Sequence, residues 1–250
     1  MATASHQSGG IRPTGTNDHR LTSAAFMVVS VTPDRPPRTE LPCVTVVPML
    51  GAVKPFFLAG LVTALVGAGV AMAPYFAGDI AAVRAVQSAA PAPGWWATPI
   101  SRLAPAPAKY YVMGIAAILA FALAGVRGLL LAVAFVALEQ YGAESTKAWF
   151  GRPRPSRELI AVVGSPSGFS FPSTTITFFS VTFGLLALIA ARVRKTPLAI
   201  GVLVAASLML ALGGLARVAL GAHWPSDVIL TAVVCLSWIW AASRVVLRRG

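Results

Sequence analysis

The sequence contains little cysteine, few acidic residues and few charges of any kind. Its two cysteines, Cys43 and Cys235, lie far apart, so their spacing indicates neither a disulfide framework nor a metal site. The first 20 residues lack the basic start and apolar core of a secretory signal. Only 11% of the 250 residues are charged, whereas 56% are hydrophobic, which excludes an ordinary soluble domain.

The charge that is present is strongly positive, with 20 Lys and Arg against 8 Asp and Glu. Such a surplus also occurs in nucleic-acid-binding proteins. Here the basic residues are scattered between long apolar runs and form no folded basic face, so we expect no nucleic-acid partner. A mean hydropathy of +0.75 favours an integral membrane protein, in which the basic residues reflect topology.

Long apolar segments predict an all-α fold, an integral membrane bundle of six transmembrane helices. A crossing helix needs about 20 mostly apolar residues, because backbone polar groups cannot stay unpaired in hydrocarbon. The six expected spans are residues 55–77, 110–126, 128–147, 172–191, 197–216 and 226–246. A short turn at residues 125–128 separates the second span from the third, which predicts a tight antiparallel hairpin.

The chain is expected to have two parts. Residues 1–48 are rich in proline and polar residues and predict a flexible N-terminal leader, followed by a six-helix membrane domain over residues 49–250. In the long loop after the first span, residues 79–90 predict a short helix on the membrane surface. Trp95 and Trp96 are interpreted as interfacial anchors.

The distribution of Lys and Arg predicts the orientation. With six spans both termini share a side, and that side holds 12 of the 20 basic residues. Five of the other eight lie in two loops that carry candidate catalytic residues. The positive-inside rule therefore predicts a multi-pass protein of the cell (inner) membrane, with cytoplasmic termini and an outward-facing site.

Three segments on that outer side bring polar groups to helix ends. They are Lys147-x6-Arg154-Pro155 after the third span, Pro172-Ser173-Thr174-Thr175 at the start of the fourth, and Arg217-x5-His223-x3-Asp227 between the fifth and sixth. Pro172 is expected at the first helical position, with hydroxyls beside unpaired backbone N–H groups. A helix start of this kind favours anion binding.

These residue types suit phosphoryl transfer. Lys147, Arg154 and Arg217 can hold phosphate oxygens and stabilise the charge of the transition state. A neutral imidazole at His223, with an ordinary pKa of about 6.5, can act as a nucleophile, and Asp227 one helical turn later can orient it. One histidine and one carboxylate supply too few ligands for a metal, so we expect no metal and no cofactor.

The three segments resemble the signature of the type 2 phosphatidic acid phosphatase superfamily, which includes lipid phosphate phosphatases, soluble acid phosphatases and vanadium haloperoxidases. That signature reads Lys-x6-Arg-Pro, Pro-Ser-Gly-His and Ser-Arg-x5-His-x3-Asp. The first segment matches fully, and the third matches with Ala216 in place of Ser. In the second, Thr174 replaces Gly and Thr175 replaces His. The resemblance covers roughly residues 50–248.

The resemblance implies a metal-independent phosphatase acting on a phosphorylated membrane lipid. In this family the histidine of the third motif attacks phosphorus, and water hydrolyses the resulting phosphohistidine. His223 would then be the nucleophile and Asp227 its orienting carboxylate. The phosphate would be held by the three cations together with Ser173 and the backbone N–H of Thr174.

Position 175 lacks the family's proton donor to the leaving group, because a threonine hydroxyl is a very weak acid. The remaining histidines, His6 and His19, lie in the leader. A phosphate leaving from a diphosphate needs less help than an alkoxide, so a lipid diphosphate such as a polyprenyl diphosphate is the favoured substrate. The alternatives are a lipid phosphotransferase, or an inactive family member that binds a phosphorylated lipid or a membrane partner.

Three other charged residues near these segments have simpler interpretations. We interpret Arg152 and Arg157 as solvated loop charges. Glu139, inside the third span, is costly in lipid and is expected to face the bundle interior or a cavity. It would be paired there either with a cation of the site or with a neighbouring helix.

Overall fold

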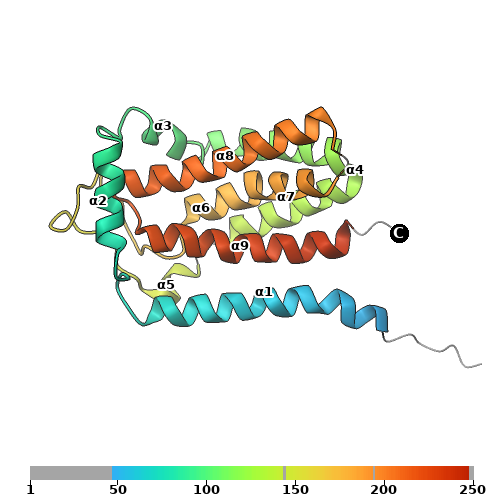
Figure 1. Cartoon of the computed structure of the whole chain (residues 1–250), viewed down its shortest axis with the longest axis horizontal. Coiled ribbons are helices and arrows are strands. Elements are labelled where there is room, and N and C mark those ends of the chain that lie inside the picture. The colour runs from blue at the N-terminus through green and yellow to red at the C-terminus, as the bar shows by residue number, and fades with distance from the viewer. Residues whose placement is uncertain (1–46, 143–144, 194, 248–250) are drawn as a thin grey trace, which may run out of the picture. The chain divides into compact units, whose positions relative to one another are not determined.

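The computed structural model describes residues 47–142, 145–193 and 195–247, and the regular elements in these residues are all helices (Figure 1). The predicted leader thus falls almost entirely outside the described residues. Five helical stretches there are long and apolar enough to cross a membrane. They are Gly51–Ala71 within α1 (Val47–Ala71), α4 (Ala108–Gly142), Thr174–Arg192, α8 (Pro197–Ala219) and α9 (Pro225–Val246).

α4 accounts for two crossings because it folds back on itself (Figure 1). Ala124 and Gly125 leave the helical conformation, and Gly125 has a φ of 61°, which glycine adopts without a steric penalty. Lys109 near the start of α4 lies 3.6 Å from Glu139 near its end, whereas a straight helix would separate them by about 45 Å. The predicted hairpin and the six-helix bundle are confirmed.

Several predicted span ends are wrong by a few residues. The first span runs over Gly51–Ala71 and not to residue 77, consistent with Pro74, which lacks an N–H group and restricts the residue before it. The third ends at residue 142 and not 147, and the fifth extends to residue 219. The fourth begins at Thr174, because Ser173 has extended backbone and caps the helix. Pro172 is therefore outside the helix.

The fourth span is the centre of the bundle and consists of α6 (Thr174–Phe179), a π-helical segment (Ser180–Gly184) and α7 (Leu185–Arg192). In its apolar window 67% of residues are buried, against 17–28% in the other four stretches. Figure 1 shows it between α8, α9 and α4. Because this central span starts with the altered middle motif, that motif is anchored in the best-packed part of the described chain.

Three short helices lie at the end where the central span starts: α2 (Asp79–Ala89), α3 (Ala97–Ser101) and α5 (Lys147–Phe150), on the left of Figure 1. The predicted helix at residues 79–90 is confirmed. Its Gln87 side chain donates to the carbonyl oxygens of Ala161 and Ala219, at 2.7 and 3.1 Å. α2 is thereby tied both to the loop after α5 and to the end of α8.

Candidate active site

The three sequence segments meet at one end of the bundle, where α8 ends and α9 and α6 begin (Figure 1). Residues 151–173 form a long loop from α5 to α6, and residues 220–224 connect α8 to α9. The backbone N–H of Val163 donates to the carbonyl oxygen of Leu220 at 2.9 Å, which joins the two loops. Residues far apart in the sequence therefore share one site.

His223 is almost completely buried, with only 1% of its surface exposed. Its Nδ1 lies 2.8 Å from the carbonyl oxygen of Ser170. Because a carbonyl oxygen only accepts hydrogen bonds, Nδ1 carries the proton of the neutral ring, and the lone pair is on Nε2. Nε2 lies 3.2 Å from Nη1 of Arg154, so the nitrogen that carries the lone pair faces a cation.

The positive charges of the predicted cations act on this imidazole. Burial, followed by the positive charges of Arg217, Arg154 and Lys147, holds the pKa of His223 well below its ordinary value. The ring is therefore neutral at physiological pH, as a nucleophile must be. Of the three predicted phosphate-binding cations, Arg154 contacts the ring directly, and the charges of Arg217 and Lys147 also act on it.

Of these cations, Arg154 is held by backbone carbonyls of the loops, whereas Arg217 has a buried nitrogen without a hydrogen-bond partner among the described residues. Nε of Arg154 donates to the carbonyl oxygens of Ser167 and Gly168, and its Nη1 donates to that of Ala222 at 2.6 Å. Nε of Arg217 is buried and has no hydrogen-bond partner within the described part of the chain. An anion beside Arg217 would supply that missing partner.

Asp227 lies behind the imidazole and contacts it less directly than its motif position indicates. Its Oδ2 is 3.9 Å from Nδ1 of His223, too far for a hydrogen bond. That oxygen accepts hydrogen bonds from the hydroxyl of Ser170 and from the backbone N–H of Trp224. Asp227 thus holds Ser170, and the carbonyl of Ser170 holds the histidine tautomer.

Arg152 is a buried structural cation, and its interpretation as a solvated loop charge is wrong. It is 2% exposed, and its Nη1 lies 2.5 Å from Oδ1 of Asp227, while Nη2 lies 3.6 Å from Oδ2 of Asp79. The folded loop leaves it no path to solvent, and two buried carboxylates stabilise its charge. Arg157 is exposed and donates to the carbonyl oxygen of Gly164.

The middle motif starts the central span with a capped helix end. Ser173 is fully buried, and its Oγ accepts a hydrogen bond from the backbone N–H of Ile176 at 3.4 Å. The backbone N–H of Ser173 donates to Oγ1 of Thr231 on α9. Thr174 and Thr175, in the first turn, line a cavity of about 620 Å³ that Arg217 also borders. Ser173 therefore fixes the helix start that faces this cavity.

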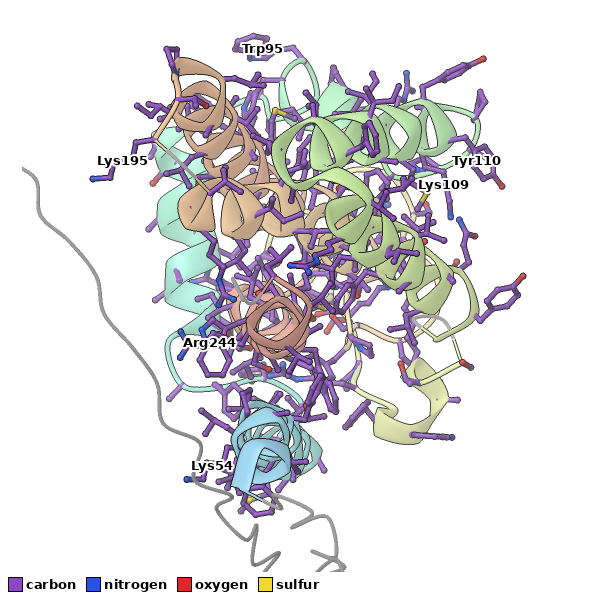
Figure 2. The ribbon with its side chains drawn as sticks, turned by 90° about the vertical axis from the view of Figure 1, so that its right-hand side faces the viewer. Lys54, Trp95, Lys109, Tyr110, Lys195 and Arg244 are labelled. Atoms are coloured by element: carbon purple, nitrogen blue, oxygen red, sulfur yellow. The ribbon has the colours of Figure 1, made fainter. Side chains whose placement is uncertain are left out.

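Glu139 and Lys109 line the same cavity, from the two ends of α4. Figure 2 labels Lys109, whose Nζ lies 3.6 Å from Glu139 and 3.2 Å from Oε1 of Gln140. The expectation that Glu139 faces a cavity is confirmed, and of the two expected partners the neighbouring helix is the one observed. The pairing cation, Lys109, comes from the first half of α4, the neighbouring helix of the hairpin, and not from the sequence motifs.

Three residues of this site were missed by the motif reasoning. Ser170 and Arg152 fall between or beside motif residues, and Asp79 begins a separate helix. Asp79 accepts hydrogen bonds from the hydroxyl and backbone N–H of Ser226, beside Asp227. A usable signal for Asp79 was present, because it is the single acid in the loop of residues 78–109.

Two comparisons relate this chain to known proteins. A family model described as the PAP2 superfamily matches residues 115–250, which include all three motif segments. No curated protein gives a significant match. The chain is similar to the crystal structure of the first transmembrane PAP2 type phosphatidylglycerolphosphate phosphatase from Bacillus subtilis. The TM-score is 0.50 at 22% identity, covering 78% of this chain and 94% of that one, which indicates a shared fold.

Proposed function

Because the chain belongs to the PAP2 superfamily, we propose that it is a metal-independent membrane lipid phosphatase that works through a phosphohistidine intermediate. Its substrate would be a lipid with a phosphate or diphosphate headgroup. The observation that carries this proposal is the environment of His223. Its Nδ1 proton is held by the Ser170 carbonyl, and its Nε2, which carries the lone pair, lies 3.2 Å from Nη1 of Arg154.

The reaction would proceed in two displacements. Lys147, Arg154 and Arg217 hold the phosphoryl oxygens, assisted by the backbone N–H of Thr174. Nε2 of His223 attacks phosphorus, and the bond from phosphorus to the leaving oxygen breaks. Water then attacks the phosphohistidine, and the bonding electron pair of the P–N bond returns to Nε2 as inorganic phosphate leaves.

Ser173 and Asp227 would act mainly by positioning. Ser173 caps the helix whose first two residues, Thr174 and Thr175, line the cavity. Asp227 fixes Ser170 and stabilises the positive charge that the imidazole gains during attack, at a separation of 3.9 Å.

An apolar cavity of about 350 Å³ supports a lipid as the substrate. It lies between α1, the second half of α4, α5, α6 and α9, and its wall includes Phe135, Phe171 and Trp238. Phe171 directly precedes the middle motif. Glu139 borders both this cavity and the polar one, so an acyl or prenyl chain could lie in the first while its headgroup occupies the second.

The proposed location is the cell (inner) membrane, with cytoplasmic termini and the site on the outer face. The end of the bundle opposite the site carries Lys54 near the start of α1, Lys195 between α7 and α8, and Arg244 near the end of α9, all labelled in Figure 2. Excess Lys and Arg at that end supports a cytoplasmic placement. The partners would be the bilayer and a phosphorylated lipid, with no nucleic acid.

Phosphate release from a polyprenyl diphosphate by the purified, detergent-solubilised protein tests this function. We expect release by the wild type and by Arg157→Ala, an exposed-charge control, and none by His223→Ala. Phosphate release by His223→Ala would contradict the mechanism. No phosphate release by the wild type would contradict the function. If phosphate leaves the lipid and appears on an added alcohol instead of in solution, the protein is a phosphotransferase.

A further inference from the structure

A single acidic side chain, Glu139, borders the cavity that the altered middle motif faces. The cavity-lining residues within the described chain include Arg102, Lys109 and Arg217 as cations, and Glu139 alone as an acid. Thr175, at the position of the family's proton donor, lines the same space. The second half of α4 therefore brings a carboxyl group to the cavity in which Thr175 lacks an acid.

The burial of Glu139 with few partners indicates that a ligand binds beside its carboxyl group. The residue is 8% exposed, and its Oε2 has no hydrogen-bond partner among the described residues, with Lys109 at 3.6 Å as an ion-pair partner. Burying a carboxylate with so few partners is costly. Oγ of Ser101 and Nε of Arg217 border the same cavity and also lack hydrogen bonds to the described residues. A ligand there would complete all three.

We propose that Glu139 is the catalytic acid of this protein, donating to the leaving oxygen the proton that the family takes from a histidine at position 175. This inference rests on the proposed function, because it concerns the same reaction. It matters most for lipid phosphate monoesters, whose alkoxide leaving group requires a proton, whereas the phosphate that leaves a diphosphate needs little help.

The charges around the cavity allow Glu139 to hold a proton when substrate is bound. A phosphate entering the cavity brings negative charge close to the carboxyl group, which favours its neutral form. Lys109 opposes this effect, while Arg217 and Arg102, the other charged groups facing the cavity, are available to the phosphate oxygens. Substrate binding thus promotes the protonated, donating state of Glu139.

Glu139 alone can donate the proton that the first step needs and recover one in the second step. As Nε2 of His223 forms its bond to phosphorus, the P–O bond of the ester breaks and its electron pair goes to the lipid oxygen. That oxygen takes the proton of Glu139 and leaves as an alcohol, which leaves Glu139 as a carboxylate. In the second step the carboxylate takes a proton from the attacking water, and the P–N pair returns to Nε2.

The test compares a lipid monophosphate with the matching lipid diphosphate in wild type, Glu139→Gln and Gln140→Ala. Loss of an acid slows the reaction with a poor leaving group selectively. We expect Glu139→Gln to lower monophosphate turnover by about 10²- to 10⁴-fold and diphosphate turnover by less than about tenfold. Gln140→Ala, which also removes a contact to Lys109, should change both rates alike.

A rescue variant separates chemistry from structure. Adding Thr175→His to Glu139→Gln restores the family's proton donor, so monophosphate turnover should recover. Equal losses on both substrates in Glu139→Gln, or no recovery in the double variant, would overturn the inference. A wild type active on the diphosphate but silent on the monophosphate would overturn it too, while leaving the proposed phosphatase intact. The loss of diphosphate hydrolysis in His223→Ala checks that function separately.

Discussion

Arg152 should be essential to the stability of the site although it is expected to bind no substrate. Besides its ion pairs with Asp227 and Asp79, its Nε donates to the carbonyl oxygen of Pro74 at 3.2 Å. Arg152→Ala would leave two carboxylates, 0% and 5% exposed, without their cation. Breaking a buried ion pair from one side costs about 3–5 kcal/mol, so we expect a loss of unfolding free energy of that size.

Thermal unfolding of the purified protein in mild detergent measures this loss. The matched control is Arg157→Ala in the same loop, where an exposed guanidinium makes a hydrogen bond to Gly164, and the expected change is within about 0.5 kcal/mol. Adding Asp79→Asn to Arg152→Ala removes one of the stranded charges and should recover part of the loss. Equal stability of the two arginine variants would refute the reasoning from buried charge.

Two further outcomes follow from the site and its packing. Because the pKa of His223 lies well below its ordinary value, kcat/KM on the diphosphate should stay constant as pH falls through about 6.5 and decline only below it; a midpoint at about 6.5 in the pH profile would contradict this. In α8, Gly213→Ala should cost about 1–3 kcal/mol in thermal unfolding, because its Cβ would overlap the Phe179 ring. Gly201→Ala, with open space around it, should stabilise by up to about 1 kcal/mol, and equal effects would contradict the close packing.

The membrane architecture was predictable because hydrocarbon permits few solutions for an apolar chain. Runs of about 20 apolar residues must form helices, so the number of crossings and the hairpin at Gly125 followed from counting. The ends of the spans were less predictable. They depend on local capping, such as the side chain of Ser173, which moved the start of the fourth span from Pro172 to Thr174.

The chemical type of the site was also present in the sequence, since Lys147, Arg154, Arg217, His223 and Asp227 occur at the spacing of a known signature. The spacing of motif residues predicts which of them lie at the same helix end, but it does not predict which atoms are in contact. The Nδ1 proton of the histidine is held by a backbone carbonyl, that of Ser170, and any residue can supply a carbonyl. No sequence pattern marks such a contact.

The sequence by itself determined a six-span membrane bundle and a set of cationic residues around one histidine, with Thr175 in place of the family's proton-donating histidine. What only the tertiary structure decided is which distant charges are neighbours. Folding back α4 brings Lys109 beside Glu139, and the loop after α5 buries Arg152 between Asp79 and Asp227. Such pairs depend on contacts between residues 30 to 75 positions apart, which helix periodicity and motif spacing do not encode.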